Sequence, residues 1–222
     1  MTAAKQVTQS SRGRLAALVA AGALVVVVVV AVLLFGVQRP PTLEGFAAGP
    51  PPPAAVAWTE SRSNETCLNI AWPDGSTTRP WCDPQGGEVV AWPDQGPIWV
   101  MRYGASMQLL EVDPDTGAVL QSRRDSDPDF RRVQPQGELT SYRDGDELVV
   151  SFDEREVWRT AAPPNYDLRW TRVSPDGEWA VLADAARRLL VIELGQSAEP
   201  RVWVDGVDLW GGLVWQGEVL ED

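Results

Sequence analysis

The sequence predicts an all-β domain that is preceded by one transmembrane α-helix. An unbroken apolar run fills residues 15–37, and short apolar segments alternate with turn signals from Trp58 onward. No long segment after the run has the period of an amphipathic helix. We therefore expect four parts: a cytoplasmic tail (1–14), a transmembrane helix (15–37), a Pro-rich linker (38–57) and an extracytoplasmic β domain (58–222).

The apolar run 15–37 has the length and composition of a membrane span. At about 1.5 Å per residue, a helix of this length covers roughly 34 Å, whereas the hydrocarbon core of a bilayer is about 30 Å thick. Six valines in a row, Val25 to Val30, would favour a strand in water. In lipid, a lone strand leaves its backbone groups unpaired. A cleavable secretion signal is the alternative, but its apolar core is usually shorter, about 7–15 residues.

The charges on either side of the run predict its orientation. Lys5, Arg12 and Arg14 precede it, and only Arg39 follows closely, so the positive-inside rule places the N-terminus in the cytoplasm. All 31 acidic residues and all but three of the 19 basic ones lie beyond the run, which gives that part a formal charge of −15. We expect such an acidic domain to bind neither nucleic acid nor anionic lipid head groups.

Cys67 and Cys82 are the two cysteines of the chain, and both lie beyond the predicted span. In an oxidising compartment they are expected to form one disulfide, which would stabilise the fold by about 3 kcal/mol. Two free thiols are the alternative. A metal site is not expected, because the chain has no histidine and two cysteines alone do not make a zinc site.

The linker 38–57 contains four consecutive prolines, Pro50 to Pro53. Such a run favours the extended polyproline II conformation. We interpret the linker as a semi-rigid spacer between the membrane and the domain, with a Pro-rich ligand for another protein as the alternative.

Short segments rich in Val, Trp and Leu follow, and each is a candidate strand: Glu88–Trp92, Ile98–Tyr103, Met107–Asp113, Ala118–Arg123, Gly137–Tyr142, Glu147–Phe152, Glu156–Thr160, Leu168–Val173, Trp179–Ala183, Arg188–Glu193, Arg201–Val204 and Leu213–Leu220. Turn residues of the types Pro, Asp and Gly separate them, as in residues 93–96, 113–117 and 175–177. Many short strands at this spacing predict an antiparallel sandwich, barrel or propeller.

Three stretches share one layout: residues 91–113, 140–159 and 174–184 each join apolar strands through an Asp-containing turn. This is a degenerate internal repeat. Within it, Val173-Ser174-Pro175-Asp176-Gly177-Glu178-Trp179-Ala180-Val181-Leu182 resembles the SPDG blade motif of TolB-type and WD-repeat-like β-propellers. Residues 110–120 are similar to the outer-strand turn of such blades.

The resemblance covers residues 86–220 and implies a propeller-like domain of about three to four blades, whereas propellers usually have about four to eight. Three alternatives follow from this shortage. Residues 58–83 add an irregular blade, several chains assemble, or the domain is an open stack of sheets.

The residue types argue against an enzyme. Without histidine, Ser-His and Cys-His nucleophile pairs are excluded. Acids are plentiful, but no spacing singles out a pair that would hydrolyse a glycoside. Asp125, Asp127 and Asp129 alternate as in a calcium loop, yet Phe130 stands where that loop needs glycine, so they are a weak metal candidate. No cofactor is expected.

All eleven tryptophans follow the linker, and most are expected to pack between sheets. Trp72 and Trp81 differ, because they lie in a Gly/Pro-rich segment closed by the expected disulfide, with little sheet pattern. We expect a loop there, in which exposed tryptophans are candidates for binding a sugar ring or a protein.

These observations predict a single-pass membrane protein with an extracytoplasmic binding or scaffold domain that docks a protein partner in the envelope. The 18 arginines against a single lysine are typical of a GC-rich bacterial genome. A protein that binds cell-wall carbohydrate is the alternative, and an envelope glycosidase comes third. Self-association of the chain stays open.

Overall fold

The computed structural model describes residues 43, 46, 49–124, 131–132, 137–164, 166–195 and 199–221. The predicted membrane span 15–37 and the weak metal candidates Asp125, Asp127 and Asp129 lie outside these residues. In the described part of the chain, no helix has the length and apolarity that a membrane crossing requires.

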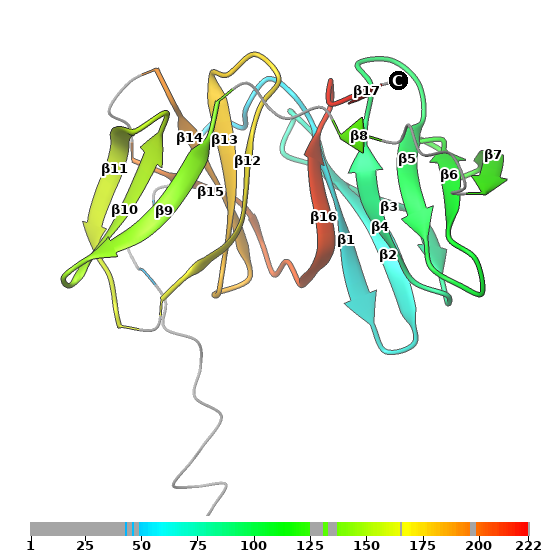
Figure 1. The fold of residues 1–222 in the computed structure, drawn as a ribbon, viewed down its shortest axis with the longest axis horizontal. Helices are drawn as coiled ribbons and strands as arrows, with labels where there is room; N and C mark the ends of the chain where they lie inside the picture. Colours follow the sequence, from blue (N-terminus) through cyan, green and yellow to red (C-terminus); the bar gives the residue numbers. More distant parts are fainter. Residues whose placement is uncertain are drawn as a thin grey trace, which may run out of the picture. The chain divides into compact units, whose positions relative to one another are not determined.

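The described residues form antiparallel β-structure (Figure 1). Four sheets have three or four strands each. The strands are β1 (Val56–Arg62), β2 (Glu65–Ala71), β3 (Thr77–Asp83), β4 (Gly87–Ala91), β5 (Ile98–Arg102), β6 (Gln108–Val112), β7 (Val119–Arg124), β9 (Leu139–Asp144), β10 (Glu147–Phe152), β11 (Arg155–Ala161), β12 (Leu168–Val173), β13 (Trp179–Asp184), β14 (Arg188–Glu193), β15 (Arg201–Asp205) and β16 (Leu209–Trp215). Two short strands, β8 (Arg131–Arg132) and β17 (Leu220–Glu221), form a separate pair.

Three of the four sheets are built from strands that follow one another in the chain. Their strand orders are β4-β5-β6-β7, β11-β10-β9 and β12-β13-β14-β15. The fourth sheet has the order β16-β1-β2-β3, so it combines the first three strands with a strand from the C-terminal end (Figure 1). Its pairing runs from Val56 opposite Trp215 to Glu60 opposite Leu209.

The hydrophobic core lies between neighbouring sheets. One cluster joins β10 and β11 to β12–β14, a second joins β13 and β14 to β1 and β16, and a third joins β1–β3 to β4–β6. Strand β13 shows why its sequence is continuously apolar: Ala180 and Leu182 belong to the first cluster, whereas Val181 and Ala183 belong to the second. A strand buried on both faces has no polar alternation.

Most predicted strands are confirmed to within two residues, and Glu147–Phe152, Leu168–Val173 and Arg188–Glu193 have the predicted bounds. The prediction Leu213–Leu220 is wrong. Strand β16 starts earlier than predicted, at Leu209. It ends at Trp215, because a turn follows in which Gly217 adopts a φ of 100°.

The turn chemistry is as expected. In the Ser174–Trp179 turn, Gly177 has a φ of 73° and its N–H donates to the carbonyl of Ser174. The Asp176 carboxylate accepts the N–H of Glu178 at 3.0 Å. In the turn before β7, the Asp113 carboxylate accepts the N–H of Thr116 at 2.7 Å. These hydrogen bonds with Thr116 lower the pKa of Asp113 below its ordinary value.

The prediction of a loop between Cys67 and Cys82 is wrong. Strands β2 and β3 occupy most of this segment. A polar residue interrupts the apolar pattern of β2, because Asn69 is buried there. The Asn69 side chain donates to the carbonyl of Cys67 and accepts from Arg79. Pro80 is tolerated in β3 because β3 is at the edge of its sheet, where a ladder hydrogen bond can be missing.

Part of the predicted spacer packs on the domain. Leu43 is buried in the first core cluster, and its carbonyl accepts a hydrogen bond from Arg188 at 3.0 Å. The ring of Phe46 lies 5.7 Å from that of Trp158. Strand β1 begins at Val56, two residues before the expected boundary of the domain.

Candidate functional site

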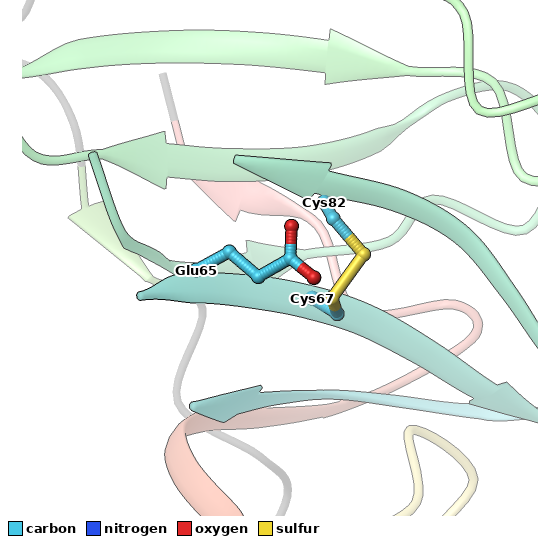
Figure 2. A group of neighbouring side chains, drawn as sticks. All are labelled: Glu65, Cys67 and Cys82. Atoms are coloured by element: carbon cyan, nitrogen blue, oxygen red, sulfur yellow. A yellow bond between two sulfur atoms is a disulfide. The ribbon is translucent and has the colours of Figure 1, made fainter. Parts of the chain in front are cut away.

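The disulfide between Cys67 and Cys82 is present (Figure 2). The two residues lie directly opposite each other on β2 and β3, with their Cα atoms 4.0 Å apart. The prediction of this bridge is confirmed. The bridge fixes the register of a hairpin whose second strand is an edge strand.

Glu65 lies beside the disulfide (Figure 2). A carboxylate oxygen of Glu65 and the two sulfur atoms lie within 4.8 Å of one another, which resembles a set of metal ligands. The sulfur atoms are bonded to each other, however, and only a thiolate is a strong metal ligand. While the disulfide is intact, this group is not a metal site.

The two tryptophans of this hairpin are placed differently from the expectation. Trp81 is only 8% exposed and belongs to the core between β1–β3 and β4–β6, so a sugar ring cannot stack on it. Trp72 is partly buried. Its ring meets that of Trp92 edge-on at 5.7 Å, and its indole N–H donates to Thr78 at 2.9 Å. The remaining tryptophans whose side chains are described are also buried or partly buried, as expected for packing residues.

A polar pocket that the sequence did not reveal lies on the face of this sheet that carries the disulfide, opposite the face of Trp81. Its volume is about 200 Å³, and it is lined by β1–β3 together with the turn between β15 and β16: Trp58, Glu60, Arg62, Asn69, Thr77, Thr78, Arg79, Val204, Asp205, Gly206 and Val207. Trp58, Glu60 and Arg62 alternate along β1 and therefore share one face. Their partners on β2 include Asn69 and Cys67, so the disulfide anchors this face.

Glu60 organises the charges of the pocket. Its side chain is buried, and one carboxylate oxygen accepts from Arg62 at 3.2 Å and from Arg79 at 3.1 Å. The other oxygen accepts the backbone N–H of Asp208 at 3.1 Å. Arg79 is held further by its bond to Asn69 at 2.9 Å. The carboxylate therefore fixes two guanidinium groups at the pocket and joins β1 to the chain that leads into β16.

The indole N–H of Trp58 has no hydrogen-bond partner among the described residues, although the residue is only 2% exposed. Trp203 shares this property but does not line the pocket. Buried N–H groups are normally paired, so a residue that lines the pocket carries an unsatisfied donor. The signal for this site in the sequence is the alternation of Trp58, Glu60 and Arg62, which acquires meaning only once Asn69 and Arg79 are known to lie beside them.

A second surface is formed by strand β7. It is one of the two edge strands of its sheet, and all six of its side chains are exposed. They include two apolar residues, Val119 at 47% and Leu120 at 58% exposed. At the other end of the strand, Arg123 lies over the ring of Trp99 at 4.6 Å, and Arg124 is exposed. An edge strand offers unpaired backbone groups to another chain.

No protein-family model matches this sequence, and a search of curated proteins finds no match.

Proposed function

We propose that this chain is a membrane-anchored binding protein whose extracytoplasmic domain docks a partner protein of the bacterial cell envelope. The apolar run 15–37 and the basic residues before it support the anchor and its orientation. The disulfide fits an oxidising compartment. Strand β7 is the observation that carries the docking function.

The occupant that suits β7 is an extended segment of the partner that adds a strand to the sheet. Backbone groups along this edge, which no described strand covers, supply hydrogen bonds, and Val119 and Leu120 supply apolar contacts. Arg123 and Arg124 at the end of the strand favour a segment that carries acidic residues there. Both arginines stand on a domain that is otherwise acidic, so charge complementarity contributes to the choice of partner.

We also propose that the four sheets are the blades of a propeller-like domain, related to the TolB-type and WD-repeat-like folds. Three sheets are built from consecutive strands, and the fourth combines both ends of the domain, which ties the termini together. Contacts of β9 with β12, of β12 with β16 and of β16 with β4 connect the sheets in one series. Repeat folds of this kind are common docking platforms.

Binding of cell-wall carbohydrate is the weaker alternative. Aromatic platforms for sugars need an open ring face. Trp81 lacks one, and Trp72 is partly covered by Trp92. Of the two candidates Trp72 and Trp81, only Trp72 could therefore contribute to glycan binding.

The docking proposal is tested by photo-crosslinking in cells. A photoreactive amino acid is placed in the full-length chain at Gln121, in the middle of β7, and as a control at Thr140, which is exposed on β9. We expect a protein adduct from Gln121 that Thr140 does not form.

The variant Leu120→Glu should abolish this adduct, because it replaces an apolar contact with a charge that repels an acidic segment. The matched variant Tyr142→Glu changes a residue of similar exposure, 49%, on another sheet and should leave the adduct intact. Equal adducts from both positions, or an adduct that survives Leu120→Glu, would refute docking at β7. An adduct of the chain with itself would show self-association, and a glycan adduct would favour the alternative.

A further inference from the structure

We propose that the pocket lined by Trp58, Glu60, Arg62 and Arg79 binds a small organic carboxylate. In this complex, the carboxylate accepts hydrogen bonds from the Trp58 indole and from the two guanidinium groups. The pocket is on a different sheet from β7, so this inference does not depend on the docking of a partner strand.

The unpaired indole is the first observation that points to a ligand. A buried N–H without an acceptor loses its hydrogen bond to water without a replacement, which destabilises the protein. Two other indoles have acceptors: Trp72 donates to Thr78, and Trp215 donates to the carbonyl of Arg172 at 3.2 Å. Trp58 has none among the described residues, and the residue lines the pocket. Its Nε1 atom is almost completely covered, so a ligand carboxylate reaches this N–H only when the neighbouring side chains of the pocket move.

The charges of the pocket determine what kind of acceptor fits. Arg62 and Arg79 share one oxygen of Glu60, so two positive charges face a single buried negative charge. Around Glu60 this leaves a charge of +1, which matches a monoanion, whereas Asp205 brings the charge of the whole lining to zero. A doubly charged phosphate would instead place excess negative charge beside Glu60 and beside Asp205 at the rim.

Arg62 and Arg79 also have N–H groups that can donate hydrogen bonds to a ligand. Each binds protein groups through Nε and Nη2: Arg62 binds Glu60 with both, and Arg79 binds Asn69 and Glu60. In the described part of the chain their Nη1 groups have no protein partner. The Arg79 side chain is 35% exposed and that of Arg62 is 53% exposed, so both can reach a ligand that enters from solvent. Planar guanidinium groups suit a planar carboxylate.

The size of the pocket restricts the ligand further. Sites for drug-sized molecules usually measure about 300–1,000 Å³. A cavity of about 200 Å³ accepts a small acid or the carboxylate end of a larger molecule. A peptide C-terminus and a sugar acid both provide such an end, and the experiment must distinguish them.

The test uses the full-length chain in detergent micelles, with ¹⁵N in the indole nitrogens, so that each tryptophan gives one N–H resonance. Trp58→Phe and Trp203→Phe assign the two indoles that lack acceptors. The probes are N-acetylglycine, which represents a peptide end, its neutral analogue N-acetylglycinamide, and glucuronate, which represents a sugar acid. Sodium chloride at equal ionic strength is the blank.

We expect N-acetylglycine to shift the Trp58 resonance downfield in a saturable way and to leave Trp203 unchanged. N-acetylglycinamide should produce no saturable shift. Arg62→Gln should weaken binding by about tenfold, since it removes one charge-assisted contact. This variant leaves Glu60 paired with Arg79, and the dispersion of the other indole resonances verifies its folding. Glucuronate binding more tightly than N-acetylglycine would identify a sugar acid as the source of the carboxylate.

Two results would overturn the proposal. The first is a Trp58 resonance that no carboxylate shifts beyond the sodium chloride blank. The second is equal binding of N-acetylglycine and its amide, because charge would then play no part in recognition.

Discussion

At the scale of single residues, Asp184 shows how this acidic domain buries a charge. Its side chain has no exposed surface, and it accepts hydrogen bonds from the Tyr166 hydroxyl at 3.1 Å and from Arg188 Nε at 2.9 Å. Arg188 in turn binds the carbonyl of Leu43. The network therefore fastens the segment before β1 to the sheet β12–β15.

Replacing Asp184 by Asn should destabilise the protein by about 3–5 kcal/mol, because the partly buried Arg188 loses its counter-charge. Asp208→Asn is the matched control. Asp208 pairs with Arg187 at the surface, where an ion pair contributes about 0–1 kcal/mol. Chemical denaturation followed by tryptophan fluorescence measures both effects, and similar losses in the two variants would contradict this account.

The same network predicts an alkaline limit of stability. Burial and the neighbouring Asp184 charge raise the pKa of Tyr166 above its ordinary value of about 10. The folded state thus holds this proton more tightly than the unfolded chain does. The contribution of Tyr166 is complete below pH of about 10 and is lost as the pH rises toward the higher pKa of the folded state.

We expect the free energy of unfolding of the wild type to decrease above pH of about 10 more steeply than that of Tyr166→Phe. Tyr142→Phe, at an exposed position, should follow the wild type. Denaturant titrations at several alkaline pH values measure the slopes. Parallel curves for the wild type and Tyr166→Phe would show that Tyr166 is not the responsible group.

At the scale of elements, the turns are specified by individual glycines. Gly177, in the SPDG turn, has a φ of 73°, but the space that a Cβ would occupy there is open. Gly117, before β7, has a φ of 71°, and a Cβ there would overlap the carbonyl of Pro80 on β3. Gly177 is thus required by its backbone angle alone. Gly117 is required by its backbone angle and also by the close contact of its turn with β3.

Alanine substitutions should distinguish the effect of the backbone angle from the effect of the steric contact. Gly195→Ala is the control, since Gly195 has open space and no positive φ, and we expect little change or a small gain in stability. Gly177→Ala should cost about 1 kcal/mol through backbone strain. Gly117→Ala should cost clearly more, because β3 and the turn must move apart. Thermal unfolding of the three variants measures this order, and equal costs for Gly117 and Gly177 would disprove the steric argument.

At the scale of the whole domain, the strand β16 joins its two ends. Leu213, Val214 and Trp215 are almost fully buried between sheets. The Arg172 side chain of β12 donates to the carbonyl of Leu213 at 3.0 Å, and the Arg172 carbonyl accepts from the Trp215 indole. Strand β16 therefore completes the sheet β16-β1-β2-β3 and binds the neighbouring sheet β12-β13-β14-β15.

A chain that ends at Asp208 should not fold. Removing several buried side chains at about 2–5 kcal/mol each exceeds the usual stability of about 5–15 kcal/mol. Moving residues 209–217 ahead of β1 through a short loop should restore folding, because Val56 and Trp215 are already paired. Near-UV circular dichroism of the β domain reports both results. A truncated chain with native signal would show that β16 is dispensable.

The sequence by itself determined the strands whose pattern is local. Where both faces are buried, as in β13 and β14, the residues are uniformly apolar, and the Pro, Asp and Gly residues of turns act through their own backbone. The disulfide was also predictable, since two cysteines in an oxidising compartment have one pairing.

Only the tertiary structure decided the features that depend on strand pairing across long distances. Strands β2 and β3 escaped prediction because Asn69 and Pro80 interrupt the pattern, and the polar groups of Asn69 are satisfied by partners elsewhere in the sheet. The pocket could not be predicted either, because its residues come together only through strand pairing. Glu60 and Arg79 are far apart in the sequence, and Asp208 is farther still, so their meeting requires the register of β1–β3 and the return of β16 to β1. A one-residue shift of that register would turn Glu60 to the opposite face, so the site exists only through the pairing.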